Sequence, residues 1–459
     1  MEIERRGAHG DLLHRLVRDG LPELRAALGA VDRRLPVWVT DELEAFVACG
    51  DPGRGFAWLE CAPCHSAVLV PLSCKGRAFC PACCGRRMAE RAAWLVERVV
   101  PHVATCQWVL TVPWKRRWLL ARNPDLALGV LRIAIARVER WYRRHTGCDE
   151  GQGGAVTVIQ RFGSSLSLNL HFHIVALDGV YVTGSDGRPS FRQATPHQPD
   201  VEALVEEIWR AAERWLRRQG HPADDDTEPD AEDASALLQQ ASLEGVEAVG
   251  PRAGRRVRRT QRLGGREVTL PPRCAGCEGY NLHAGVSVRG TDRDALERLL
   301  RYTLRPPLAK GRLSEAPDGT VVLELKRAWS DGTSQVSFSR ADFVGKLAAL
   351  VPPPRSNQTV YHGVLAGNAG MREAVVPPAP DRTEEEQATR KARKLTREPT
   401  RDTPGWADLL LRVFGEDELV CRHCRGPLTL RAVVVHPPAT TRILDGLARA
   451  RPPPLFTGA

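Results

Sequence analysis

The sequence lacks any apolar run near the ~20 residues that a membrane-spanning helix needs. Its first residues, Met1 to Arg6, also lack the apolar segment of a secretory signal peptide, so we expect a cytoplasmic protein with no membrane contact. No Gly-x4-Gly-Lys-Ser/Thr phosphate loop is present, so we expect no dependence on ATP. What remains is a chain of 459 residues, 42% hydrophobic and 26% charged, which suits a globular protein of two or three domains.

Basic residues outnumber acidic ones in this chain. The 65 Lys and Arg residues exceed the 55 Asp and Glu residues, which gives a net charge of +10 and a pI of about 9.1. Arginine exceeds lysine, and the planar guanidinium group suits phosphate. A polyanionic partner such as nucleic acid is therefore a fair hypothesis, although many basic proteins bind none.

Most of the thirteen cysteines stand in Cys-x2-Cys pairs, which in a chain without an export signal indicates metal binding rather than disulfides. Two pairs enclose fifteen residues, the spacing of a four-thiolate zinc site. The predicted ligands of one structural zinc ion are Cys61, Cys64, Cys80 and Cys83, with Cys74 and Cys84 as surplus thiols. The pair Cys421 and Cys424 has no mate in sequence, and is either vestigial or joined in space to Cys274 and Cys277.

The stretch Leu168 to Asp178 predicts a β-strand. Alternate residues of a strand share a face, so Leu170, Phe172 and their neighbours form an apolar face, and His171 and His173 lie on the other. Two imidazoles so placed can converge on one metal ion, although two half-buried histidines bonded to backbone are the simpler alternative. A third ligand is needed, and the candidates on predicted strands are His283 and Gln160. The sequence favours His283 weakly.

A predicted helix carries a tyrosine among arginines. The helix begins after Thr291 or Asp292 and runs to Arg305, before Pro306-Pro307. Behind its apolar stripe the helix carries a row of basic residues, Arg298, Arg301 and Arg305. We expect these arginines to contact DNA. Tyr302 lies near the seam between the apolar stripe and this row. It is either a tyrosine at the edge of the core with a solvated hydroxyl, or a nucleophile for a phosphodiester.

The order of predicted strands and helices indicates an α+β fold with an antiparallel sheet. Residues 1–100 are interpreted as a helical N-terminus with the zinc-binding domain, and residues 101–350 as the catalytic domain. Within the latter, residues 219–266 read as a mobile insert that is first acidic and then basic. Residues 351–459 are interpreted as a linker and C-terminal accessory region, with a helix candidate at 406–414.

Several motifs together resemble one family, the zinc-binding, rolling-circle transposases of bacterial insertion sequences. The motifs include Gln107-Trp-Val-Leu-Thr-Val-Pro113, Cys74-Lys-Gly-Arg-Ala-Phe-Cys-Pro81, Asn169-Leu-His-Phe-His173 and Arg301-Tyr-Thr-Leu-Arg-Pro-Pro-Leu308. The resemblance runs from about residue 40 to 450. These transposases are HUH (histidine–hydrophobe–histidine) endonucleases, and the resemblance implies metal ligands at His171 and His173 and a nucleophile at Tyr302. Some members carry two tyrosines four residues apart, whereas Arg298 occupies that position here, which favours a single-tyrosine enzyme.

The resemblance implies cleavage and rejoining of single DNA strands through a 5′-phosphotyrosine, with Mg2+ or Mn2+ at the histidines and structural Zn2+ elsewhere. The expected partners are single-stranded or extruded transposon ends in the bacterial nucleoid, and a homodimer is left open. The alternatives are a plasmid replication initiator or relaxase with the same chemistry, and a non-enzymatic zinc-ribbon DNA-binding protein. An RNase-H-like transposase needs three carboxylates and leaves the histidine pair without a role.

Overall fold

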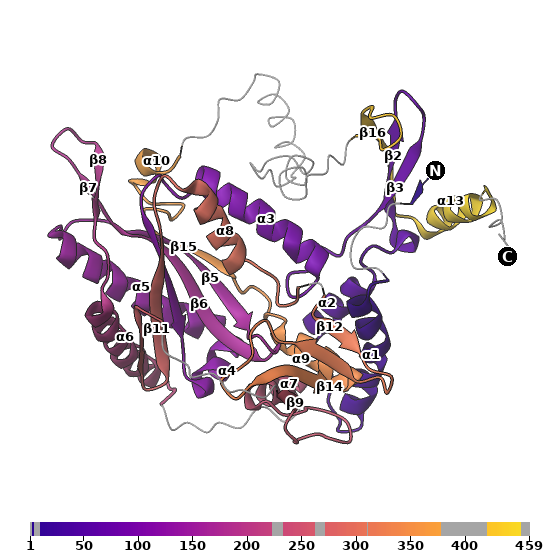
Figure 1. Cartoon of the computed structure of the whole chain (residues 1–459), viewed down its shortest axis with the longest axis horizontal. Coiled ribbons are helices and arrows are strands. Elements are labelled where there is room, and N and C mark those ends of the chain that lie inside the picture. The colour runs from indigo at the N-terminus through magenta and orange to yellow at the C-terminus, as the bar shows by residue number, and fades with distance from the viewer. Residues whose placement is uncertain are drawn as a thin grey trace.

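The computed structural model describes residues 2–3, 10–222, 233–261, 271–309, 311–377 and 420–450. At its centre lies a six-stranded sheet in which every neighbouring pair is antiparallel (Figure 1). From edge to edge its strands are β10 (Cys274–Cys277), β11 (Tyr280–Val288), β4 (Thr105–Thr111), β6 (Leu168–Leu177), β5 (Gly154–Phe162) and β15 (Thr359–Gly363). The expected α+β class with an antiparallel sheet is confirmed.

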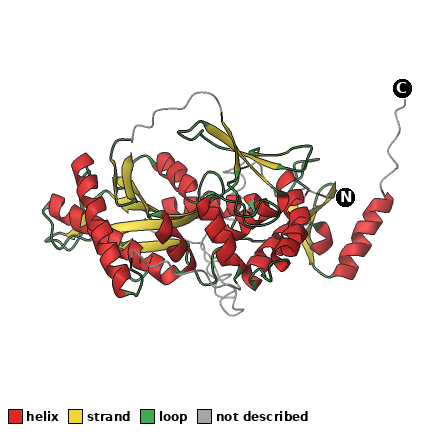
Figure 2. Cartoon of the chain, turned by 90° about the horizontal axis from the view of Figure 1, so that it is seen from below, coloured by secondary structure: helices red, strands yellow, loops and turns green. Residues whose placement is uncertain are grey.

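Helices pack against the large sheet (Figure 2), and the alternation of β6 shows how they are held. Leu170, Phe172 and Ile174 are buried in one core with α5 (Pro124–Thr146) and α6 (Gln198–Arg218). On the opposite face, Val175 and Leu177 are buried in a second core with α3 (Pro81–Arg98) and α8 (Arg293–Thr303). The sheet is therefore covered on both faces, and α8 lies on the face that also carries the histidines.

The region 116–144, expected to be helical, forms two helices because the helix is interrupted before Pro124. The first is α4 (Trp114–Arg122), and Pro124 occupies the first turn of α5, where its missing N–H leaves no hydrogen bond unmade. At its other end α5 stops at Gly147, which adopts a left-handed φ of 65°.

The N-terminal helices share their core with the central region of the chain. Helix α1 (Leu12–Gly29) packs against α9 (Arg340–Leu350) and contacts α2 (Val37–Val47). A Cβ atom at Gly20 would lie 2.8 Å from Val344 Cγ2 and 3.0 Å from the Arg340 carbonyl oxygen, so a glycine permits this close approach. Residues 12–29 are thus packed on an element that the sequence assigned to the central domain.

Within residues 219–266, interpreted from the sequence as a mobile insert, residues 233–261 contain regular secondary structure. Helix α7 (Ala234–Glu244) begins at Asp233, whose side chain accepts a hydrogen bond from the Ser235 N–H. Its apolar side chains are buried against α9, which the many charged neighbours in sequence obscured. Strand β9 (Arg258–Gln261) then joins a second sheet, with β14 (Thr333–Phe338), β13 (Val321–Glu324) and β12 (Leu313–Glu315).

Both ends of the described chain meet in a small sheet at the upper right of Figure 1. Its order is β1 (Glu2–Ile3), β3 (Ala67–Pro71), β2 (Phe56–Cys61) and β16 (Leu428–Val434). Helix α13 (Pro437–Ala450) follows β16 and contacts the short helix η1 (Pro52–Arg54). The expected helix at 406–414 lies outside the described residues.

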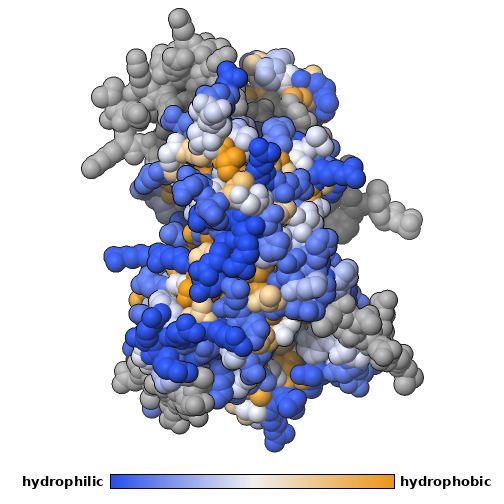
Figure 3. All heavy atoms as spheres, turned by 90° about the vertical axis from the view of Figure 1, so that its left-hand side faces the viewer, coloured by the Kyte–Doolittle hydropathy of each residue, from blue (hydrophilic) through white to orange (hydrophobic). Residues whose placement is uncertain are grey.

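The remaining elements are short. Strands β7 (Gly179–Thr183) and β8 (Pro189–Gln193) form a hairpin, and α10 (Arg372–Val375) is a single turn. The face at the left of Figure 1 is mostly hydrophilic, with small separate apolar patches (Figure 3). Within the described residues, no helix is both long and apolar enough to cross a membrane.

We expect the Phe172→Ala substitution to destabilise the protein by about 3–5 kcal/mol, because it leaves a cavity in the core behind the histidines. Phe172 is fully buried, at 0% exposure. A shift of the urea unfolding midpoint to lower concentration measures the effect. The control is Trp114→Ala, since Trp114 is 56% exposed and its removal should change stability by only about 0.5 kcal/mol or less. Equal midpoints for the two variants would contradict this packing.

Candidate active site and metal centres

Strand β6 presents His171 and His173 side by side on one face. Their Nε2 atoms lie 3.1 Å apart, and two ligands at right angles around a metal ion, each about 2.1 Å from it, are separated by about 3.0 Å. His171 Nδ1 lies 2.8 Å from the Asn169 carbonyl oxygen. Because a carbonyl oxygen only accepts, Nδ1 of His171 carries the proton and its Nε2 keeps a free lone pair. The pair is therefore oriented as metal ligands are.

The neighbouring strand β4 orients the second histidine. Gln107 places its side-chain amide nitrogen 2.9 Å from His173 Nδ1. An amide nitrogen only donates, so Nδ1 accepts and Nε2 carries the proton; rotating the amide by about 180° would put its oxygen there and free Nε2 for a metal ion. Such a partner leaves His173 Nε2 facing His171. Gln107 was not recognised from the sequence as part of the site. In the β4–β6 register Gln107 lies opposite Val175, which is two residues from His173 on β6. This register brings the Gln107 side chain to His173.

Burial keeps both imidazoles neutral. It lowers the pKa of His171 to about 4, and it lowers the pKa of His173 to about 3, with further lowering from its neighbour His171. Only the neutral ring offers a lone pair to a metal ion. Near pH 7 no proton has to be displaced from a charged imidazolium before a metal ion binds.

Of the two expected third ligands, the structure brings Gln160 to the pair. Gln160 lies directly opposite His171 in the β5–β6 register, so their side chains share a face. Its amide nitrogen donates to the Thr303 carbonyl oxygen, while its Oε1 is buried and has no hydrogen-bond partner. An orphaned carbonyl oxygen beside two imidazoles is a plausible metal ligand in chemistry and in position.

His283 is not brought to the pair. It lies on β11 opposite Val109 of β4, which in turn lies opposite His173, so a whole strand separates the two histidines. Among the described residues, no further His, Cys, Asp or Glu has a ligand atom that lies within 4.8 Å of the ligand atoms of both His171 and His173. The weak preference for His283 is thus not supported by the geometry, because the sequence could not fix the order of the strands.

Tyr302 stands over the histidines at the C-terminal end of α8. Its ring centroid lies 6.0 Å from that of His173, with the ring planes at 88°. The apolar side chains of α8 are buried on the second core, and Asp292 caps the helix start as expected by accepting from the Ala295 N–H. Tyr302 itself is 43% exposed. The described helix ends at Thr303, two residues before the expected end, so Arg305 lies in the following loop.

Cations surround the tyrosine. Arg305 Cζ lies 4.2 Å from the centre of the Tyr302 ring, and Lys326 Nζ lies 5.6 Å from it. Arg298 is exposed one helical turn before Tyr302 and on the same side of α8. Arg301 is half-buried on that helix. The positive potential at the tyrosine side chain therefore comes from the helix, the loop after it and the loop after β13.

A cleft of about 810 Å3 opens beside this site, between α3, β5 and the loop after α8. It reaches Gln160 and Thr303 and is rich in cationic side chains. Those lining it are Lys75, Arg77, Arg86, Arg87, Arg91, Arg161, Arg305 and Arg355, against the acidic side chains Glu42 and Glu90. Several already have partners: Arg86 pairs with Glu90, and Arg87 donates to the Lys75 and Gly76 carbonyl oxygens.

A buried arginine holds the strand that carries Gln160. Arg161 donates to the Ala121 carbonyl oxygen at 2.7 Å and to the Leu350 carbonyl oxygen at 3.2 Å. These oxygens lie at the C-terminal ends of α4 and α9, where the helix dipole favours a positive charge. Burial lowers the pKa of Arg161 to about 10, so the guanidinium stays charged near neutral pH. We interpret Arg161 as a structural clamp on β5.

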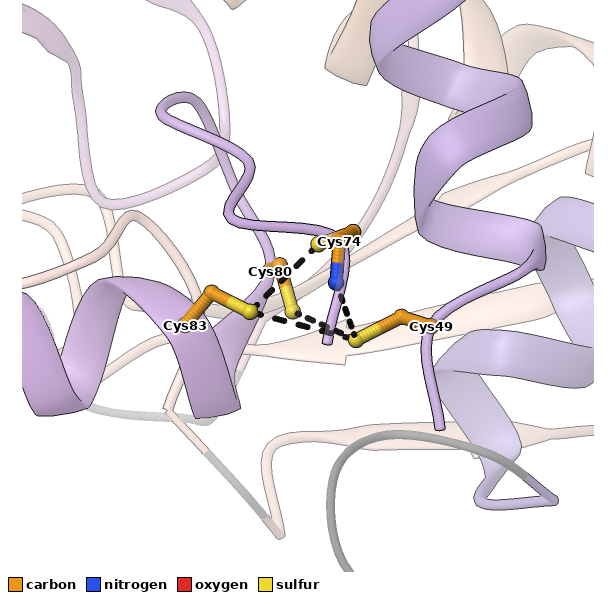
Figure 4. A group of neighbouring side chains, drawn as sticks. All are labelled: Cys49, Cys74, Cys80 and Cys83. Atoms are coloured by element: carbon orange, nitrogen blue, oxygen red, sulfur yellow. Dashed lines mark hydrogen bonds between the residues drawn. The ribbon is translucent and has the colours of Figure 1, made fainter. Parts of the chain in front are cut away.

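The predicted zinc ligands do not form one site. Cys80 and Cys83, at the start of α3, lie with Cys49 and Cys74 instead of with Cys61 and Cys64, and Figure 4 shows the four sulfur atoms turned toward one another. The Cys49 sulfur lies 3.8 Å from that of Cys80 and 3.9 Å from that of Cys83. Sulfur atoms around a tetrahedral zinc ion are about 3.8 Å apart. Spacing along the chain misled the prediction because a lone cysteine, Cys49, supplies a ligand from the end of α2.

Further features of the Cys49 cluster fit a thiolate site. The backbone N–H of Cys74 donates to the Cys49 sulfur, and that of Gly76 donates to the Cys74 sulfur. Four thiols leave no open position on a tetrahedral ion, so a zinc here is structural. Of the two surplus thiols, Cys74 belongs to this cluster, whereas Cys84 is buried outside it, and burial raises its pKa to about 12.

Comparison with known families supports this description. A family model described as “Transposase zinc-binding domain”, of IS91 type, matches residues 17–112, which include the whole Cys49 cluster. A second model, described as “Putative transposase”, matches residues 154–373, which include Gln160, the histidine pair and Tyr302. No curated protein and no solved structure matches the chain. The chain therefore belongs to the zinc-binding transposases of IS91 type, enzymes that process DNA and carry structural zinc.

Proposed function

We propose that this transposase cleaves and rejoins single DNA strands through a 5′-phosphotyrosine at Tyr302. The observation that supports this best is the position of Tyr302, whose ring lies 6.0 Å from that of His173 on the same face of the sheet. The histidines and the tyrosine belong to separate elements, β6 and α8, and the fold brings them to one place. A tyrosine with only a packing role would not need partial exposure beside two neutral imidazoles.

His171, His173 and Gln160 are the residues that would hold a divalent ion here. Mn2+ suits imidazole better than Mg2+ does, although cells offer mostly Mg2+. When bound, such an ion supplies Lewis-acid stabilisation of the charge that develops on the scissile phosphate. The protein's own contribution is to keep both rings neutral and to fix their orientation through Asn169 and Gln107.

The proposed step exchanges one phosphate ester for another. The Tyr302 oxygen attacks the phosphorus atom and loses its proton, while the bond to the leaving 3′-oxygen breaks and that oxygen takes up a proton. The new phosphotyrosine ester retains the bond energy, so a second 3′-hydroxyl can reverse the step and join a strand without ATP. Arg305, beside the Tyr302 ring, favours the anionic transition state electrostatically.

The basic cleft beside Gln160 is the proposed path for the single strand. Its arginines suit a phosphate backbone. The scissile phosphate has to reach a tyrosine on the surface of a helix, and base pairing within a duplex hinders that approach. Arg298, Arg301 and Arg305 extend the positive surface along α8. The match to a transposase family favours transposon ends as the substrate over a plasmid origin.

We expect Tyr302→Phe to abolish the covalent protein–DNA adduct, because the variant lacks the attacking oxygen. The measurement is the formation of a detergent-resistant adduct between the full chain and a 3′-labelled oligonucleotide with the transposon end sequence, in Mn2+, because a 5′-phosphotyrosine keeps the 3′ fragment attached. Tyr181→Phe is the control, since Tyr181 is buried away from the histidines and should keep adduct formation. An undiminished adduct in Tyr302→Phe would refute the assigned nucleophile.

We expect Gln160→Ala and His283→Ala to differ. Loss of a direct metal ligand should weaken Mn2+ binding by more than the about 10-fold to 100-fold that follows loss of an outer partner. Gln160→Ala should show this loss, whereas His283→Ala, one strand further away, should bind Mn2+ like the wild type. Mn2+ titration followed by electron paramagnetic resonance measures both. The opposite ranking would identify His283 as the ligand.

We expect Arg77→Ala and Arg305→Ala to weaken binding of single-stranded DNA without metal. Removing one guanidinium that binds a phosphate should reduce the slope of log K against log salt by about 0.7. Fluorescence anisotropy over a range of salt concentrations measures that slope. Arg188→Ala is the matched control, because Arg188 is exposed on the β7–β8 turn and does not line the cleft. If all three variants bound alike, the cleft would not be the path.

A further inference from the structure

We infer that Cys61, Cys64, Cys421 and Cys424 form a second structural zinc site, which joins residues from both ends of the described chain beside the small sheet β1–β3–β2–β16. The four ligand atoms lie within 4.8 Å of one another. The Cys61 and Cys424 sulfur atoms are 3.3 Å apart, and those of Cys64 and Cys421 are 3.6 Å apart. These separations approach the about 3.8 Å of a tetrahedral zinc thiolate site.

Each cysteine pair has the same local backbone. His65 N–H donates to the Cys61 carbonyl oxygen at 2.9 Å, and Arg425 N–H donates to the Cys421 carbonyl oxygen at 2.9 Å. Both residues that follow a pair adopt a left-handed conformation, with φ of 56° at His65 and 62° at Arg425. The two segments are therefore two matching metal-binding turns, which face each other although more than three hundred residues separate them in sequence.

Strand pairing brings the two turns together. In the β2–β16 register Leu428 lies opposite Cys61, and the Ala62 N–H donates to the Pro427 carbonyl oxygen. Ser66 lies between the turns, with its Oγ 3.0 Å from the Cys64 sulfur and 3.2 Å from the Cys421 sulfur. The pair Cys421 and Cys424 thus has its mate in Cys61 and Cys64, and the alternative of a site with Cys274 and Cys277 is not formed.

A zinc ion at this site would hold the two turns together. Closing the long loop between Cys64 and Cys421 is entropically costly, and the small sheet offers few buried residues to offset that cost. Thr440 of α13 donates to the Gly53 carbonyl oxygen, so the C-terminal helix is held on the same N-terminal segment. Zinc at this site would fix β16 and α13 to the region that also contains the first zinc cluster. The family model for zinc binding ends at residue 112 and does not include this half of the site.

The test is the zinc content of the purified full chain by elemental analysis. We expect two zinc ions per chain in the wild type and one in Cys421→Ser/Cys424→Ser. The control is Cys274→Ser/Cys277→Ser, a pair with the same spacing, which should retain two. One zinc in the wild type, or two in Cys421→Ser/Cys424→Ser, would overturn the proposal.

Two further measurements extend the test, and the first of them does not depend on the folding of the double variant. Titration of the wild type with Co2+ should give tetrathiolate absorption that saturates at two equivalents, and saturation at one would overturn the proposal. In the double variant that folds, amide hydrogens of residues 428–434 should exchange faster, while those of residues 168–177 should be unchanged. Equal protection of residues 428–434 in both proteins would mean that no metal ion holds β16.

Discussion

The strict alternation of side chains along β6 is the constraint on which the site depends. One set of residues, with Phe172 at its centre, is buried against α5 and α6 and fixes the position of the strand. The opposite set is forced onto the other face, where Val175 and Leu177 enter the core under α3 and α8, and His171 and His173 lie beyond its edge. A shift of one residue would bury the imidazoles among apolar side chains, so the packing that stabilises the sheet also sets the register of the site.

The same second core determines where Tyr302 lies. Leu296, Leu299 and Leu300 hold α8 against the sheet, and the helix brings its last turn over the histidines. The tyrosine is thus anchored by residues that take no part in chemistry. Around it the protein combines neutral rings, kept so by burial, with cations that remain in contact with solvent. In the proposed function, this separation would let one site hold a metal ion and a phosphate backbone together.

The cysteines organise the N-terminal region by a different means. The Cys49 cluster joins the end of α2, the loop before α3 and the start of α3, and so fixes the wall of the basic cleft. Thiolate ligands from distant segments give a small region the order that its limited core does not provide. The cleft and the face that carries the histidines are therefore connected through α3, which contributes to both the cluster and the second core.

The sequence by itself determined the local features: the alternation that separates Phe172 from His171, a cap of α8 at Thr291 or Asp292, the α+β class, and the presence of zinc-binding cysteines. Each of these depends on residues close together in the chain. Only the tertiary structure decided which distant residues meet. Strand order brought Gln160 rather than His283 to the histidines, and chain closure divided the predicted zinc ligands between Cys49 and the C-terminal cysteines. Residue spacing carries no information on such pairings, because they are set by how whole strands and helices pack.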